Sequence, residues 1–215
     1  MPSLAAIFDF FLHLDKHLQE IVASYGAWAY GIIFLIIFSE TGLVIAPFLP
    51  GDSLLFVVGM LAATGGLNLY VAGAILILAA VLGDAVNYSI GRRLGLKVFD
   101  NPRSKIFKRE YLTRTESFYE RYGGKTIIIA RFVPLVRTFA PFLAGIGQMK
   151  YLRFASYNVV GAILWVAVCT LGGYFFGNLP AVRDNFSLVI LLIVVVSTLP
   201  AVIEFIRAKL RSRNQ

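Results

Sequence analysis

The chain has 215 residues, of which 58% are hydrophobic, and its formal net charge is +8 at pH 7. Soluble globular proteins contain roughly 45–50% apolar residues, so the composition excludes an ordinary soluble domain and favours a single membrane domain over residues 1–215. Most of the apolar residues lie in five blocks, at 27–49, 53–66, 69–90, 126–149 and 154–206. One membrane crossing needs about 20 such residues, so the blocks predict an all-α polytopic membrane protein.

The first 24 residues carry polar and apolar side chains that recur at helical spacing. This pattern predicts an amphipathic helix over 1–24 that lies in the membrane interface. His13 and His17 are four residues apart, as in a metal-binding pair, but no third ligand stands nearby. We therefore expect no metal site and no cofactor.

The next two apolar arms, 27–49 and 53–66, flank Pro47, Pro50 and Gly51. The second arm is too short to cross a membrane. The arms therefore predict a re-entrant helical hairpin that enters from the outside. The first arm is long enough to cross alone, which would place the N-terminus in the cytoplasm, and this alternative stays open.

Block 69–90 follows an uncharged loop and precedes Arg92 and Arg93. Short basic loops beside membrane helices mark the cytoplasmic side, so the block predicts a crossing from the outside to the cytoplasm. Together with the hairpin at 27–66 it makes a first repeat over 26–91.

The polar segment 92–125 carries ten Lys and Arg residues, and the tail after residue 206 adds four. Their place beside apolar blocks indicates a cytoplasmic face in contact with anionic lipid headgroups, and argues against nucleic acid as a partner. Residues 104–122 within this linker predict a polar interfacial helix. The linker and the C-terminus should both be cytoplasmic.

An even number of crossings must lie between two cytoplasmic segments, yet three apolar stretches follow the linker. The conflict disappears if 126–149, which contains Pro134 and Pro141, is a second re-entrant hairpin. The remaining crossings are then 154–177, which completes a second repeat over 126–179, and the final transmembrane helix at 186–206.

One apolar phrase occurs twice, as Ala-Pro-Phe-Leu-Pro-Gly at 46–51 and as Ala-Pro-Phe-Leu-Ala-Gly at 140–145, 94 positions later. A single crossing separates the copies, so the second repeat is inverted relative to the first. The two hairpin tips should then approach the membrane midplane from opposite faces. Paired broken helices of this kind are the best indication in a sequence of a transporter's binding site.

Five charged residues lie within or beside the apolar blocks: Glu40, Asp52, Asp84, Arg131 and Arg137. Each charge costs roughly 2.5–3.5 kcal/mol at the bilayer centre, so these side chains must form pairs, be hydrated or bind a ligand. If the tips meet, the two carboxylates of the first hairpin face the two guanidinium groups of the second.

The arginine side chain is a planar fork of donors that suits phosphate, and the helix restarting at Pro134 would add backbone N–H groups. Arg131 and Arg137 are therefore the candidate anion-binding residues. Glu40 and Asp52 are candidates for proton carriers, because a protonated carboxylate would release an arginine for the substrate. The alternative is a buried salt-bridge lock without a ligand.

Two further features suit helix packing as well as function. Asp84, Asn87 and Tyr88 form a polar face near the cytoplasmic end of block 69–90, and either packing or a role in the transport path would explain them. Gly173 and Gly177 suit close contact between helices.

An intramembrane enzyme is excluded, because its nucleophile needs a histidine partner and both histidines lie in the N-terminal helix. The leading interpretation from these residues is a membrane transporter with an anion site, and a family resemblance implies that it is a flippase for a lipid phosphate. The alternatives are a proton-coupled carrier of a small ion or osmolyte, a general phospholipid scramblase and a purely structural role. The sequence does not indicate an oligomeric state.

Four motifs carry a resemblance to a known family: Phe-Ser-Glu-Thr-Gly at 38–42, Pro-Gly-Asp at 50–52, Gly-Asp-Ala-Val-Asn-Tyr at 83–88 and Ala-Arg-Phe-Val-Pro-Leu-Val-Arg-Thr-Phe-Ala-Pro at 130–141. They resemble the bacterial DedA family over most of the chain. The resemblance implies an inner-membrane protein with two opposed re-entrant hairpins, which returns undecaprenyl phosphate or a related phospholipid across the bilayer, with proposed proton dependence. The residues that match its acidic and arginine positions are Glu40, Asp52, Arg131 and Arg137.

Overall fold

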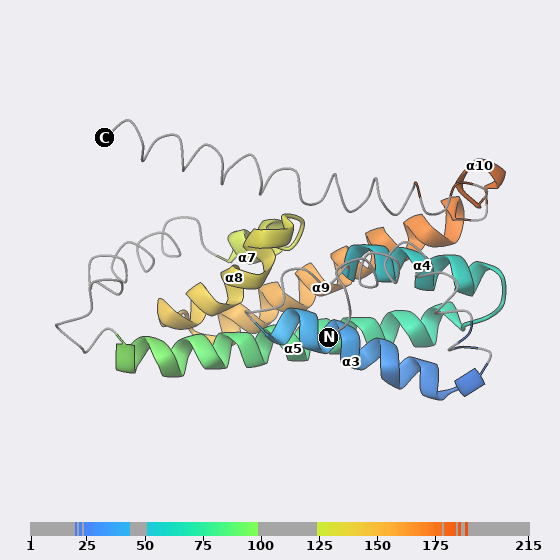
Figure 1. Cartoon of the computed structure of the whole chain (residues 1–215). Coiled ribbons are helices and arrows are strands. Elements are labelled where there is room, and N and C mark those ends of the chain that lie inside the picture. Colours follow the sequence, from blue (N-terminus) through green and yellow to red (C-terminus); the bar gives the residue numbers. More distant parts are fainter. Residues whose placement is uncertain are drawn as a thin grey trace, which may run out of the picture. The chain divides into compact units, whose positions relative to one another are not determined.

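The computed structural model of the chain describes residues 20, 22, 24–43, 51–98, 124–177, 179–183, 185 and 188 (Figure 1). Every regular element in these ranges is a helix. The helices are α3 (Trp28–Gly42), α4 (Gly51–Ala63), α5 (Leu69–Val98), α7 (Lys125–Ala130), α8 (Pro134–Ile146), α9 (Tyr151–Phe176) and α10 (Pro180–Arg183). Most of the helices predicted at 1–24, 104–122 and 186–206 lie outside the described residues, as do His13, His17, Pro47 and Pro50.

Two of these helices are long and apolar enough to cross a membrane, over the 26-residue stretches Leu69–Leu94 and Tyr151–Phe176. At 1.5 Å per residue each is about 39 Å long, more than the hydrocarbon core of about 30 Å. They confirm the long apolar helices predicted at 69–90 and 154–177. Two short helices precede each long one, α3 and α4 before α5, and α7 and α8 before α9. The inverted arrangement of these two sets stays a prediction.

The chain folds into two compact units. The first takes its described residues from 1–34, 48–76 and 166–215, and the second from 35–47 and 77–165. Helices α3, α5 and α9 therefore contribute residues to both units.

In the first unit, α4 and the C-terminal part of α9 pack with their backbones in close contact. A Cβ atom on Gly59 would overlap the carbonyl oxygen of Thr170, and one on Gly173 would overlap that of Phe56. Gly177 likewise has no room for a side chain. Small residues let two helices approach this closely, so the close packing predicted at Gly173 and Gly177 is confirmed.

The variant Gly59→Ala should lower the free energy of unfolding by about 1–3 kcal/mol, because the added methyl group forces α4 away from α9. Thermal unfolding of the purified protein in detergent measures the effect. The matched control is Gly73→Ala on α5, where nothing lies within 4 Å of the new Cβ atom; it should be neutral or stabilising, by about 0.5–1 kcal/mol. Equal unfolding temperatures for the two variants would contradict the close contact.

The second unit has an apolar core built from α5, α7, α8 and the start of α9. Its buried members are Tyr88, Ile127, Ala130, Ala140, Ala144, Met149 and Phe154. The Tyr88 ring stacks on Phe154 at a centroid distance of 4.5 Å, and its hydroxyl donates a hydrogen bond to the Met149 carbonyl. Of the two roles left open for Tyr88, these contacts support helix packing.

Helix α5 makes close backbone contacts with both α3 and α8 in this unit. A Cβ atom on Gly83 would overlap the Thr41 hydroxyl, and one on Gly145 would overlap the Tyr88 carbonyl. Asp84 directly follows Gly83, so the contact between α3 and α5 also determines where this carboxylate lies.

The predicted hairpin at 126–149 contains one helix break. Helix α7 ends at Ala130, and α8 begins at Pro134 after an extended Val133. A proline suits the first turn of a helix, where its missing N–H costs nothing, and it favours an extended residue before it. The predicted break at Pro141 differs from the structure, because Pro141 lies inside α8 and the helix continues through it.

Candidate functional site

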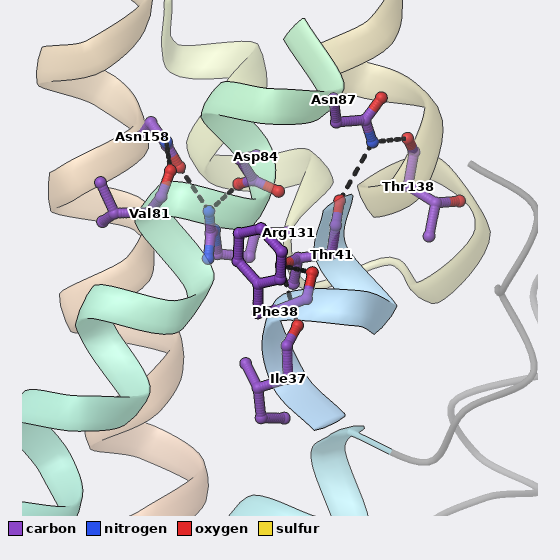
Figure 2. Close-up of polar contacts among 9 residues, drawn as sticks. All are labelled: Ile37, Phe38, Thr41, Val81, Asp84, Asn87, Arg131, Thr138 and Asn158. Atoms are coloured by element: carbon purple, nitrogen blue, oxygen red, sulfur yellow. Dashed lines mark hydrogen bonds and ion pairs between the residues drawn. The ribbon is translucent and has the colours of Figure 1, made fainter. Parts of the chain in front are cut away.

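Arg131 follows the last residue of α7 and lies buried at the centre of the second unit, 2% exposed. Its Nη2 group donates hydrogen bonds to Oδ2 of Asp84 on α5 and to Oδ1 of Asn158 on α9, the latter at 2.5 Å (Figure 2). The Asn158 amide nitrogen donates in turn to the Val81 carbonyl at 3.1 Å. The guanidinium group is thus shared by a carboxylate on one long helix and an oriented amide on the other.

A second buried ion pair joins α3 to α8. The Nη2 group of Arg137 donates a hydrogen bond to Oε1 of Glu40, and both side chains are almost fully enclosed. Removing one partner of a buried pair is strongly destabilising, by about 3–5 kcal/mol, because the remaining charge is left without compensation. Each of the two ion pairs therefore depends on both of its members.

The aromatic ring of Trp165 on α9 lies within reach of both arginines. The Cζ atom of Arg137 is 4.7 Å from the ring centroid, and that of Arg131 is 5.8 Å away. A cation within about 6 Å of a tryptophan ring is attracted by the negative face of the π system. Trp165 is itself fully buried, so one ring supports two cations in an apolar surrounding.

Asn87 on α5 links the two helices that carry the second ion pair. Its Nδ2 group donates to the Thr41 carbonyl at 3.1 Å and to the Thr138 carbonyl at 2.8 Å (Figure 2). Thr41 is next to Glu40 near the end of α3, where helical carbonyls have no partner within the helix. These two bonds tie the end of α3 to α8 through one side chain on α5.

The variant Asn87→Leu should destabilise the protein by about 1–3 kcal/mol, because it removes two buried hydrogen bonds that contribute roughly 0.5–1.5 kcal/mol each. The unfolding temperature in detergent checks this. Ser89→Ala, which removes only a hydrogen bond to the Ala85 carbonyl within α5, is the control and should change the temperature much less. A loss no larger than in the control would show that α3 and α8 do not depend on Asn87.

The formal charges of Glu40, Asp84, Arg131 and Arg137 sum to zero, so the site is charged but neutral overall. Buried polar atoms of the site without a hydrogen-bond partner among the described residues include Oδ1 of Asp84, Nη1 of Arg131 and Oδ1 of Asn87. A buried polar group without a partner costs free energy. One donor group on Arg131 is therefore available to an anion without breaking an existing hydrogen bond.

The structure brings together most of the site residues predicted from the sequence, but with different pairing. Glu40 pairs with Arg137, within the expected set. The carboxylate partner of Arg131 is Asp84, which the sequence ranked below Asp52. Asp52 is half-buried in the first turn of α4 and belongs to the first unit, as does Gly51, the first residue of that helix. Asp84 belongs to the same unit as Arg131.

Sequence reasoning missed Asn158, Trp165 and the glycine between them, Gly161. The three residues follow one face of α9 over two turns, since helical positions i, i+3 and i+7 share a face. A polar amide in an otherwise apolar crossing is costly, and this signal could have identified Asn158. Nothing in the sequence distinguishes Trp165 from an aromatic residue that anchors a helix in lipid.

Comparison with known proteins gives the family. The VTT domain matches residues 49–175. The chain is 61% identical to Protein DedA of Escherichia coli strain K12 over 97% of this chain and 96% of that protein. It is 46% identical to an uncharacterized membrane protein of Mycobacterium tuberculosis over 85% of this chain and 81% of that protein. It is 38% identical to the inner membrane protein YqjA of Escherichia coli over 70% of this chain and 69% of that protein. No solved structure matches. The chain is a membrane protein of the DedA family, as its motifs predict.

Proposed function

We propose that this protein is a flippase of the bacterial inner membrane that carries a lipid phosphate, foremost undecaprenyl phosphate, from one leaflet to the other. Arg131 and Arg137 bind the phosphate, and the hydrocarbon tail stays in the bilayer. The observation that supports this most is the burial of two arginines against one aromatic ring, each in an ion pair with a carboxylate. Arginine binds phosphate through the same N–H groups that it offers to a carboxylate.

The exchange of one anion for another gives the mechanism. A phosphate that enters the site competes with Asp84 for Arg131 and with Glu40 for Arg137. A proton taken up by either carboxylate weakens its ion pair and favours the phosphate, which would couple lipid movement to proton movement. Asp52 stays in the proposal as a further proton carrier on the first hairpin.

Helix lengths support the re-entrant architecture that such a carrier needs. Helices α3 and α4 have 15 and 13 residues, which gives lengths of about 22 and 20 Å at 1.5 Å per residue, less than the roughly 30 Å hydrocarbon core. The break before Pro134 leaves α7 with 6 residues and α8 with 13, each too short for one crossing. Irregular backbone at membrane depth is tolerated where it lines a cavity, so both hairpins would face the carrier's interior. The C-terminus would lie in the cytoplasm.

Lipid analysis of the purified protein tests the proposal. Mass spectrometry of co-purifying lipids should find polyprenyl phosphate enriched in the wild type and absent in Arg131→Ala and Arg137→Ala. The matched control is Arg153→Ala on the exposed start of α9, which should keep the lipid. Enrichment of phospholipids of every class would point to a general scramblase instead. Retention of the lipid in both buried-arginine variants would refute the assigned site.

A further inference from the structure

Helix α9 contacts the arginines through three uncharged residues, Asn158, Gly161 and Trp165. Asn158 accepts a hydrogen bond from Arg131. One turn later, Gly161 leaves space for the stem of the same side chain: a Cβ atom there would lie 3.4 Å from Nε and 3.6 Å from Cδ of Arg131. A further turn on, the Trp165 ring lies beside both guanidinium groups.

The ring and the carboxylates contact different parts of a guanidinium group. Carboxylates and phosphates accept hydrogen bonds from the N–H groups, which point outward in the plane of the group. An aromatic ring attracts the cation through its π face and needs no N–H group. An incoming phosphate therefore competes with Asp84 and Glu40 but leaves the ring contact in place.

Two arginines that have lost their carboxylates repel each other, and the repulsion is strong where the dielectric constant is low. The Trp165 ring on α9 lies beside both guanidinium groups and stays there when the carboxylates leave. We infer that Trp165 is the positioning residue of the site, which holds Arg131 and Arg137 ready for an anion once both have released their carboxylates. This inference rests on the proposed function for the identity of the anion. The contact between the Trp165 ring and the arginines does not depend on that function.

Replacing the ring by a smaller side chain, with or without a π face, tests the inference. Trp165→Phe keeps a π face, and Trp165→Leu does not. Because a buried cation–π contact contributes about 2 kcal/mol and about 1.4 kcal/mol corresponds to tenfold in affinity, Trp165→Leu should bind farnesyl phosphate in detergent at least about tenfold more weakly than the wild type. Trp165→Phe should retain most of the affinity. Equal affinity of the Leu and Phe variants would overturn the inference.

Tryptophan emission adds a direct readout, since Trp28 and Trp165 are the chain's two tryptophans. Trp28 is 78% exposed, so Trp28→Phe leaves a folded protein whose emission reports on Trp165 alone. Farnesyl phosphate should change this emission in a saturable way, and farnesol, which lacks the phosphate, should not. The change should be lost in Arg137→Gln. Binding without any change in emission would overturn the inference.

A double-mutant cycle separates this inference from the proposed function, because it needs no ligand. Unfolding temperatures of Trp165→Leu, Arg137→Met and the double variant should be non-additive, with the double variant losing clearly less than the two single losses combined. Non-additivity together with no binding of farnesyl phosphate would refute the proposed function and leave the hold of Trp165 on the arginines standing. Strict additivity would overturn the inference, whatever the protein binds.

Discussion

Replacing Asp84 by alanine should destabilise the protein by about 3–5 kcal/mol, because the Arg131 charge then lies buried without its carboxylate. That loss is a large share of the roughly 5–15 kcal/mol that stabilises a typical protein. Thermal unfolding in detergent, with the amount of protein in the membrane as a second measure, checks the expectation. An unchanged unfolding temperature would mean that Asp84 is not the carboxylate on which Arg131 depends.

The double variant Asp84→Asn/Arg131→Gln is the control for this prediction. It removes both charges but keeps two polar amide groups that can hydrogen-bond to each other and to Asn158. A buried pair replaced as a whole is often tolerated, so most of the lost stability should return. Lipid-phosphate binding should not return, since Arg131 is gone. If binding did return with stability, the pair would be a structural lock only.

Exchanging the charges of the Glu40–Arg137 ion pair should restore folding without restoring binding. Glu40→Arg alone would bury two cations together, and Arg137→Glu alone would bury two carboxylates. Each should cost more than the about 3–5 kcal/mol of a missing partner, so neither single variant should accumulate as folded protein. The double variant restores opposite charges and should accumulate, as measured by membrane content and a single peak in size-exclusion chromatography.

Farnesyl phosphate binding should stay lost in this folded double variant. A carboxylate would then occupy position 137, which now contacts the Trp165 ring as a cation. Failure of the double variant to accumulate beyond the single variants would contradict the direct pairing of Glu40 with Arg137. Normal binding by a well-folded double variant would show that the anion does not need a cation on α8.

The fold was predictable where a single residue has one dominant physical effect. Pro134 must begin a helix or interrupt one, and α8 begins there. Pro141 has the same chemistry but a different outcome, because α8 continues through it. No local rule decides between the two outcomes. The membrane helices at 69–90 and 154–177 followed from length and hydrophobicity alone.

The site was predictable in its members but not in its pairing. A charge within an apolar block must find a partner, which identified Glu40, Asp52, Asp84, Arg131 and Arg137 as candidates. The structure pairs Arg137 with Glu40 and Arg131 with Asp84, the carboxylate that had been ranked below Asp52. Which carboxylate meets which arginine depends on helix rotation, and a helix that is apolar all round gives no signal of its inward face. The contact between Gly83 and Thr41 sets that rotation for α5. For the same reason the sequence could not reveal that Trp165 points at the arginines and not at lipid.

Because the charges of the buried site cancel, a membrane potential acts differently on the unloaded and on the loaded carrier. A membrane potential acts on a moving charge with about 2.3 kcal/mol per elementary charge per 100 mV, and it exerts no net force on an unloaded carrier whose four ionised groups sum to zero. A singly charged lipid anion that joins this group makes the loaded form sensitive to voltage, unless one proton travels with it. Transport into vesicles with an imposed potassium diffusion potential would therefore report how many protons accompany each lipid.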